Sequence, residues 1–385
     1  MTTSFSFTTT KTLINAPDSL QELGSHLSKL GVKRPLIVTD QGIVSAGLLD
    51  QIERALDGTE LSIDTYADVV ADPAESIVLN ALDQAKQHQA DGIIGFGGGS
   101  SMDTAKVIAL LACSGESLDE IYGVEQAKGP RLPLVLIPTT AGTGSEVTAV
   151  AIITTGETTK SGVVSPLLLP DIALLDAKLT LGLPAQVTAA TGIDAMVHAI
   201  EAFTSIHKKN PYSDMLAREA LKLMSSNIET AVSNGDDLDA RQNMLFGAAL
   251  AGQAFANAPV AAVHALAYPL GGHFHIPHGL SNSLVLPHVM RFNAPKAAHW
   301  YAELCDLILP DNPGDSETDK THLLINHFEA LINRLGLPCQ LRDAGVSESS
   351  LETLAADAML QQRLLINNPR VVNEADALAI YQAAF

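Results

Sequence analysis

The sequence predicts two domains: an N-terminal α/β domain on a mostly parallel sheet, and an all-α C-terminal domain. The chain has 385 residues, more than a single hydrophobic core usually supports. Up to about residue 176, short β-branched runs alternate with helical segments, which is the pattern of βα units. Beyond residue 183 the chain is rich in Ala and Leu, and no comparable strand-like run follows. We therefore expect residues 1–180 and 181–385 to form the two domains, with the boundary near residues 177–184.

Four apolar runs without alternation are the expected strands, because strands of a parallel sheet are covered on both faces. They are residues 35–39 (PLIVT), 92–96 (GIIGF), 134–137 (LVLI) and 172–175 (IALL). Helices are expected between them, for example at residues 45–56 and 74–89.

The second domain is expected to open with a helix in which Pro184 is the first helical residue. This helix would continue through TAATGIDAMVHAIEAFTS. Residues 310–320 (PDNPGDSETDK) are expected to form a solvated loop.

The charge balance disfavours two classes of partner. A net charge of -20 and a pI near 4.8 disfavour binding to nucleic acid or to an anionic membrane surface. The three cysteines show no paired spacing, which disfavours a disulfide framework or a thiolate metal site. No secretory signal pattern or membrane-spanning run is visible, so we expect a cytoplasmic protein.

Histidines and one aspartate suggest a metal site in the helical domain. Asp194 and His198 stand four residues apart, so both side chains project from one face of a helix. Alone, such a pair is more often a hydrogen bond on a helix surface. The segment VHALAYPLGGHFHIPHGLSN adds four histidines within fifteen residues: His264, His273, His275 and His278.

Together, these residues favour a site of three imidazoles and one carboxylate. We expect Pro277 and Gly279 to form a turn that directs His278 into it. Nitrogen and oxygen ligands suit Fe(II), Zn(II), Mn(II) or Co(II), and ligand type does not select among them.

A glycine run after the second expected strand suggests a dinucleotide site. In GFGGGSSMDTAK, the residues Gly97, Gly98 and Gly99 permit a pyrophosphate to approach the backbone at a helix start. Ser100 and Ser101 would supply a helix cap and hydroxyl donors. The alternative is an ordinary glycine turn between strand and helix. We predict that this loop binds a pyrophosphate, and hence that the N-terminal domain is a Rossmann-like dinucleotide-binding domain.

Two further segments are candidates for cofactor contact. Asp40 ends the first expected strand, where its carboxylate could accept hydrogen bonds from a ribose and repel a 2′-phosphate, favouring NAD over NADP. A simple strand-end turn residue is an equal alternative. The segment PTTAGTGSEVT, with Thr139, Thr140 and Thr143, could wrap a cofactor or only turn the chain.

With these motifs in view, the whole chain resembles the iron-containing (group III) alcohol dehydrogenases, a family that includes lactaldehyde and propanediol oxidoreductases. The likeness lies in GGGSSMDTAK, PTTAGTGSEVT, GIDAMVHAIEAF and HALAYPLGGHFHIPHGLSNSLVLPHVMRFN. It implies that the metal ligands are Asp194, His198, His264 and His278. It also implies a pyrophosphate loop at the glycine run, NAD tuning by Asp40, cofactor contacts from the three threonines, and Lys160 near the cofactor.

The resemblance further implies a reaction. We expect an NAD-dependent enzyme with a divalent metal, Fe(II) or alternatively Zn(II), that interconverts a small alcohol and its aldehyde or ketone by hydride transfer. The substrate would bind in a cleft between the domains, lined in part by Val150 and Phe255. A homodimer is expected, because dimers are the commonest closed oligomers.

The chain departs from the family at one position. Many members have a histidine four residues after the third ligand, within HxxxHPLG, whereas this chain has Tyr268. A phenol is a poorer base than imidazole at neutral pH. The proton route could therefore use Tyr268, His273 or His275.

Other activities stay open at this point. Within the wider superfamily they are those of maleylacetate reductase, glycerol dehydrogenase and hydroxyacid-oxoacid transhydrogenase. Outside the enzymes, the alternative is a non-catalytic protein that binds metal and nucleotide.

Overall fold

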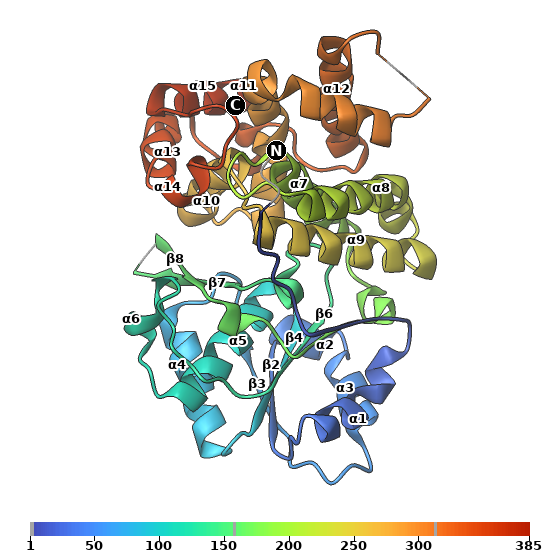
Figure 1. The fold of residues 1–385 in the computed structure, drawn as a ribbon, viewed down its shortest axis with the longest axis vertical. Coiled ribbons are helices and arrows are strands. Elements are labelled where there is room, and N and C mark those ends of the chain that lie inside the picture. Colours follow the sequence, from blue (N-terminus) through green and yellow to red (C-terminus); the bar gives the residue numbers. More distant parts are fainter. Residues whose placement is uncertain (1–3, 157–158, 312–313) are drawn as a thin grey trace. The chain divides into compact units, whose positions relative to one another are not determined.

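The structure is a computed structural model that describes residues 4–156, 159–311 and 314–385. It divides into an α/β unit, Thr8–Gly182, and a helical unit that begins at Leu183 (Figure 1). Residues 4–7 also belong to the helical unit, where the rings of Phe5 and Phe7 lie 6.1 and 5.2 Å from that of Tyr212. The predicted fold class is confirmed.

The α/β unit is built on a six-stranded sheet in the order β1-β9-β6-β4-β2-β3, in which every pair is parallel. Its strands are β1 (Thr12–Asn15), β2 (Pro35–Asp40), β3 (Asp64–Val69), β4 (Gly92–Gly97), β6 (Leu134–Pro138) and β9 (Ile172–Leu175). The four expected strands are β2, β4, β6 and β9. The sequence did not indicate β1 and β3, because these edge strands are only partly buried and lack a continuous apolar run.

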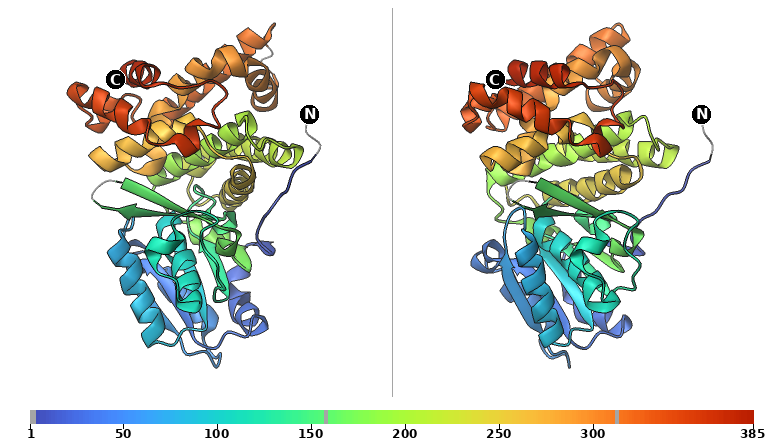
Figure 2. Two further views of the ribbon diagram at one scale, coloured as in Figure 1. Left: turned by 60° about the vertical axis from the view of Figure 1, so that its left-hand side comes forward. Right: turned by 90° about the vertical axis from the view of Figure 1, so that its left-hand side faces the viewer.

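Helices cover both faces of this sheet (Figure 2). They are α1 (Leu23–Lys29), α2 (Gln41–Ser45), α3 (Leu49–Leu56), α4 (Glu75–Gln87), α5 (Gly99–Ser114) and α6 (Leu118–Ile121), with a 3-10 turn η1 (Ser19–Glu22). Along β2, Leu36 and Val38 join the core under α4 and α5, whereas Ile37 joins the core under α1 and α3. Both faces of the strand are therefore apolar, which explains the absence of alternation.

The helix expected at residues 45–56 is wrong in its first part. Gly47 has a φ of +69° and separates α2 from α3, because a left-handed residue cannot continue a helix. The helix expected at residues 74–89 is present as α4.

A second, three-stranded sheet in the order β5-β8-β7 was not predicted. It contains β5 (Gly123–Val124), β7 (Val150–Thr155) and β8 (Thr159–Val164), and β7 and β8 pair as an antiparallel hairpin. Three 3-10 turns complete the unit: η2 (Ser145–Val147), η3 (Pro166–Leu168) and η4 (Ala177–Thr180).

The helical unit packs around α7, of which fifteen residues are buried. Its helices are α7 (Ala185–Thr204), α8 (Pro211–Ser233), α9 (Leu238–Asn257), α10 (Ala262–Phe274), α11 (His278–Ile308), α12 (Glu317–Arg334), α13 (Leu351–Ala358), α14 (Gln362–Leu365) and α15 (Glu374–Ala384), with 3-10 turns η5 (Leu341–Ala344) and η6 (Glu348–Ser350). A buried helix of this kind is apolar on most of its circumference, so polar residues within it need a specific reason.

Two expectations about helix ends need correction. Pro184 is the N-cap of α7 and not its first residue. The loop predicted at residues 310–320 extends too far, because α12 already begins at Glu317. Ser316 caps this helix: its hydroxyl oxygen accepts a hydrogen bond from the amide of Asp319. Residues 312 and 313 of that segment lie outside the described residues.

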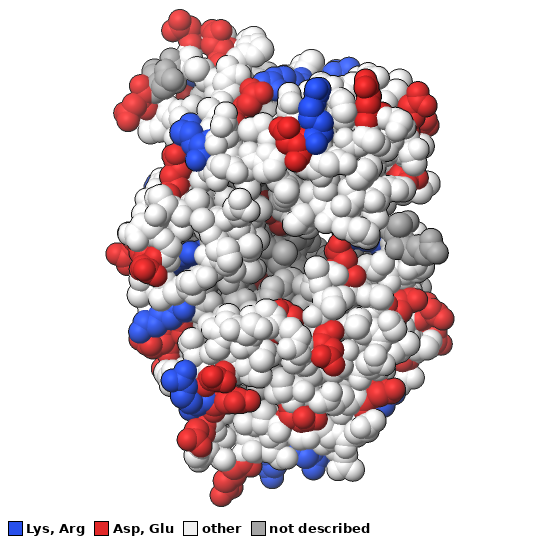
Figure 3. Space-filling model, turned by 180° about the vertical axis from the view of Figure 1, so that it is seen from behind, with Lys and Arg blue, Asp and Glu red and all other residues white. Residues whose placement is uncertain are grey.

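Acidic side chains lie on the surface of both units, in keeping with the net charge of -20 (Figure 3). Among the described helices, no single one is long and apolar enough to cross a membrane. The pair α9 and α10, with a bend of 106° between them, is long and apolar enough when taken together.

Candidate functional site

One face of α7 carries three polar residues in a buried setting. Asp194, His198 and Glu201 follow at intervals of four and three residues, so they share a face of the helix. Their exposed fractions are 1%, 4% and 3%. Buried polar groups in this arrangement require partners, and α10 and α11 provide them.

His264 and His278 reach the same place from two other helices. His264 is the third residue of α10 and is buried, while His278 is the first residue of α11 and is half-buried. The expected turn around His278 is therefore wrong: Pro277 is the N-cap of a 31-residue helix. A Cβ on Gly279 would lie 2.4 Å from the carbonyl oxygen of Ala190, so only glycine lets α11 start this close to α7.

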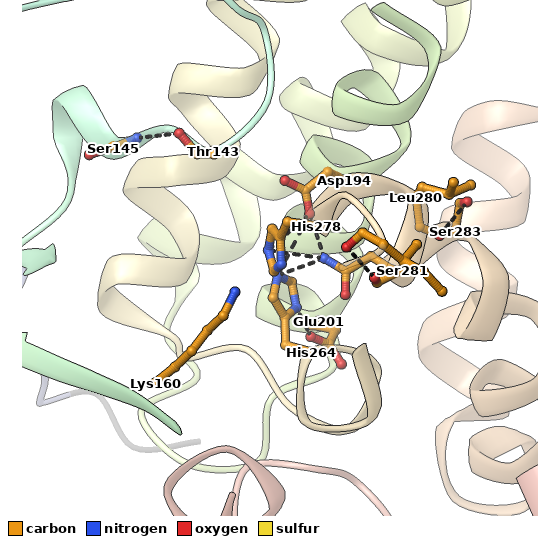
Figure 4. A network of polar contacts seen from close by, with 12 residues as sticks. Thr143, Ser145, Lys160, Asp194, Glu201, His264, His278, Leu280, Ser281 and Ser283 are labelled. Atoms are coloured by element: carbon orange, nitrogen blue, oxygen red, sulfur yellow. Dashed lines mark hydrogen bonds and ion pairs between the residues drawn. The ribbon is translucent and has the colours of Figure 1, made fainter. Parts of the chain in front are cut away.

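The four predicted ligands converge. One donor atom from each of Asp194, His198, His264 and His278 lies within 4.8 Å of all the others. Asp194 Oδ1 is 3.8 Å from His264 Nε2 and 3.6 Å from His278 Nε2 (Figure 4). Tetrahedral ligands bound at about 2.1 Å would lie about 3.4 Å apart. A carboxylate and three imidazoles at this spacing fit a divalent transition metal.

The charge state of Asp194 suits a metal ligand. Burial raises the pKa of its carboxyl group, but His198, His278, His264 and a hydrogen bond from Asn282 outweigh burial and lower the pKa overall. Asp194 is therefore an anion at neutral pH.

Two residues of this site were missed from the sequence. Asn282 Nδ2 lies 2.5 Å from Asp194 Oδ1 and 3.3 Å from the Nε2 atoms of both His264 and His278. Glu201 Oε2 accepts a bond of 2.7 Å from His264 Nδ1 (Figure 4). Their spacing in the sequence could have identified them. Glu201 is three residues after His198 and Asn282 is four residues after His278, so each shares a helix face with a predicted ligand.

Aromatic rings border the ligand set. Phe255 stacks on His198 with ring centroids 4.4 Å apart, and Tyr268 lies 5.9 Å from the ring of His278. Both predicted positions thus lie beside predicted metal ligands. Among the histidines expected near the proton route, His273 is exposed and bonds Asp357 at 2.5 Å, and His275 is exposed at the end of α10 with a φ of +54°.

The α/β unit gathers the predicted nucleotide residues at the carboxyl ends of three neighbouring strands. Asp40 ends β2, Gly97 ends β4, and Thr139 follows β6. After β2 the chain forms β3 on one side of it and then crosses back to form β4 on the other side. The boundary between β2 and β4 is therefore a switch point of the sheet. Ligands of open α/β sheets bind at such points.

The three glycines of the loop differ in their surroundings. Gly97 has a φ of +144°, and a Cβ on Gly99 would lie 2.9 Å from Thr143 Cγ2, so both are required by the fold. A Cβ on Gly98 would meet only Thr140 Oγ1, at 3.9 Å. Gly98 is therefore the position where the backbone is open to a ligand.

The expected serine cap is wrong. Gly98 is the N-cap of α5, and the side chain of Ser101 instead donates to Asp40 Oδ2 at 3.1 Å. Ser100 is the second residue of α5. Asp40 also caps α2, because its Oδ1 accepts from the amides of Gly42 and Ile43. The ribose-binding and turn-forming interpretations of Asp40 are thus compatible.

A buried polar network, not predicted, fastens the threonine segment to α5. Lys106 is fully buried and donates to Ser145 Oγ at 2.7 Å, Thr148 Oγ1 at 3.1 Å and the carbonyl of Val150 at 2.7 Å. Beside it, Glu146 is 2% exposed, and burial raises the pKa of its carboxyl group to about 7. This network holds the turn after β6 in place.

The remaining predicted residues lie on the small sheet. Lys160, in β8, forms an ion pair of 2.6 Å with Asp72. Val150 is half-buried at the start of β7.

Comparisons with known proteins identify the family of this chain. Residues 10–177 match the iron-containing alcohol dehydrogenase family, and residues 188–385 match the C-terminal region of the Fe-containing alcohol dehydrogenase family. Long-chain-alcohol dehydrogenase 1 of Geobacillus thermodenitrificans is 42% identical over 95% of this chain and 93% of its own length.

Two solved structures are similar over almost the whole chain. A 1,3-propanediol oxidoreductase has a TM-score of 0.96 at 35% identity, covering 99% of this chain and 100% of its own. The sulfoacetaldehyde reductase of Bifidobacterium kashiwanohense, in complex with NAD+, has a TM-score of 0.88 at 26% identity, covering 99% of this chain and 98% of its own.

Proposed function

This chain belongs to the iron-containing alcohol dehydrogenase family, and we propose that it is an NAD-dependent enzyme that interconverts a small alcohol and its aldehyde or ketone. The observation that carries the proposal is the convergence of Asp194, His198, His264 and His278 within 4.8 Å. We propose iron as the metal, because the family match names it and the donor set accepts it.

The four side chains would hold the metal, which as a Lewis acid would make the alcohol hydroxyl easier to deprotonate. The protein supplies the geometry. Three donors lie on buried segments of helices, so their rotamers are restricted by packing. Side chains held rigidly in this way would orient the bound substrate, and orientation is a large part of catalysis.

The α/β unit would hold NAD, which accepts or delivers the hydride. The backbone at Gly98, at the start of the 16-residue helix α5, would bind the pyrophosphate through amide hydrogens and the positive end of the helix dipole. Thr140 and Thr143, both half-buried, offer hydroxyls next to that loop. Asp40 would accept from the ribose with oxygen lone pairs that the cap of α2 leaves available.

Two aromatic residues would shape the surroundings of the reacting carbon. Phe255 covers one face of the His198 ring and would exclude water from it. Tyr268 lies beside His278 and would pass the hydroxyl proton onward, since His273 is already bonded to Asp357. Replacing Tyr268 by Phe should lower turnover more than it raises the KM of the alcohol.

The proposal is tested with anaerobically purified protein, loaded with Fe(II) or Zn(II) and assayed with NADH and NADPH over a panel of aldehydes. We expect metal-dependent oxidation of NADH with at least one small aldehyde, and slower oxidation of NADPH. A protein that binds metal and NADH but oxidises no NADH across the panel would contradict the proposal and support the non-catalytic alternative. Turnover without added free NAD would favour a transhydrogenase.

A further inference from the structure

We infer that Glu201 is a positioning residue of the metal site that fixes both the ring of His264 and the backbone at the start of α10. The inference rests on the proposed metal site and names a residue outside its four ligands. Glu201 lies on α7, seven residues after Asp194, and is 3% exposed.

The carboxylate of Glu201 has three partners, and all lie at the start of α10. Oε2 accepts from the amide of Ala261 at 2.9 Å and from His264 Nδ1 at 2.7 Å. Oε1 accepts from the amide of Val263 at 2.7 Å. Ala261 is the N-cap of α10, where backbone amides lack partners within the helix. Glu201 therefore fixes both the imidazole and the backbone that carries it.

These bonds determine which nitrogen of His264 is free. A carboxylate can only accept, so Nδ1 must carry the hydrogen. The lone pair of a neutral ring is then on Nε2, the atom that faces Asp194 Oδ1 at 3.8 Å. A carboxylate behind a ligating imidazole also makes the ring a stronger donor.

Glutamine cannot reproduce these contacts. Because Oε1 and Oε2 both accept hydrogen bonds, the amide of a glutamine would place NH2 against an N–H group whichever way it is turned. If NH2 replaces Oε2, it would donate to Nδ1 and move the His264 hydrogen onto Nε2, where it would block the metal.

The test uses the full chain with Co(II) alone as the probe, so it does not depend on turnover. Affinity is measured by titration of the visible absorption of bound Co(II), and folding by circular dichroism. We expect E201Q to bind Co(II) about 10- to 100-fold more weakly than the parent, as for other outer partners of ligating histidines. The matched control is D214N, which removes a half-buried carboxylate bonded to Lys209 in the same unit and should leave Co(II) affinity within about twofold.

Folded E201Q with Co(II) affinity within about twofold of the parent would overturn the inference. If E201Q does not fold, E201D replaces it: it keeps the charge but is one methylene shorter, so its bond to His264 should weaken and Co(II) affinity should fall. Parent-like affinity of folded E201D would then overturn the positioning role. A parent protein that binds no divalent ion would instead reject the proposed function, so the two failures are distinguishable.

Discussion

The two candidate sites are built on different principles. In the helical unit, side chains from α7, α10 and α11 converge, and each contributes one donor atom. In the α/β unit, the loops after β2, β4 and β6 present backbone and hydroxyl groups at adjacent strand ends. The first site therefore depends on the identity of a few side chains, and the second depends on the absence of side chains and on loop conformation.

Buried carboxylates show the difference in electrostatic terms. Asp194 and Glu146 are 1% and 2% exposed, yet their pKa values move in opposite directions. Burial raises the pKa of both. Three imidazoles and Asn282 reverse this effect at Asp194, whereas the backbone amide of Glu146 itself and the charge of Lys106 only reduce it at Glu146. The helical unit thus stabilises the anionic form of its buried carboxyl group, whereas the α/β unit makes its buried carboxyl group harder to ionise.

The largest expected effect comes from removing the ligand charge. Asp194→Asn keeps the shape of the side chain but loses the anion, and kcat/KM for the alcohol should fall roughly 1,000-fold, or about 4 kcal/mol. Because the nucleotide residues lie in the other unit, the dissociation constant for NADH, measured by fluorescence titration, should change less than about threefold. A loss of NADH affinity as large as the loss of turnover would show that the two sites are not separable.

The second effect is a pH dependence of stability confined to the α/β unit. Between the ordinary glutamate pKa of 4.5 and the folded-state pKa of about 7, only the unfolded state releases the proton of Glu146, so the free energy of unfolding falls as pH rises through this window. The loss amounts to about 3 kcal/mol, and Glu146→Gln should abolish it.

Protection factors of the β4 and β6 amides in hydrogen exchange, determined at pH 5 and pH 8, measure this loss of stability. The fluorescence of Trp300, the single tryptophan and a residue of α11, serves as the control signal for the helical unit. Equal pH dependence in the parent and in Glu146→Gln would refute the assignment to Glu146.

The third effect tests close packing at the metal site. Gly279→Ala places a Cβ against the backbone of Ala190 and should displace the start of α11, lowering the free energy of unfolding by about 2 kcal/mol and reducing bound metal. Gly192→Ala is the matched control, because the atoms nearest its Cβ would be side-chain atoms of Ile228 and Met244 and not backbone atoms. Metal content and urea unfolding separate the two, and equal losses would exclude a special role for Gly279.

The fourth effect tests the open backbone of the nucleotide loop. Gly98→Ala has room for its Cβ and an ordinary φ of -79°, so the melting temperature should be unchanged. The methyl group would occupy space needed by a pyrophosphate, and the KM for NADH should rise about tenfold, or 1.4 kcal/mol. An unchanged KM would place the phosphates elsewhere.

The smallest effect concerns the choice between NAD and NADP. Asp40→Asn can still cap α2 but no longer repels a 2′-phosphate, so the preference for NADH over NADPH should narrow about fivefold, or roughly 1 kcal/mol. The ratio of kcat/KM values for the two cofactors measures it. An unchanged ratio would leave Asp40 with its capping role alone.

Sequence reasoning succeeded where the signal is local or repeated. The buried strands β2, β4, β6 and β9 are continuous apolar runs. The four predicted ligands lie in two dense segments, and the structure brings their side chains together. The predictions missed features that depend on tertiary contacts. The role of Glu201 depends on its hydrogen bond to His264 on another helix. The strands β1 and β3 lie at the edges of the sheet, where a continuous apolar run is not required.

The most direct test of the account is the metal stoichiometry of the full chain after anaerobic incubation with Fe(II) and removal of free metal. We predict about one tightly bound ion per chain in the parent and almost none in His264→Ala, with both proteins binding NADH equally. Equal metal content in the two proteins, or none in the parent, would contradict the claim that these helices form the metal site.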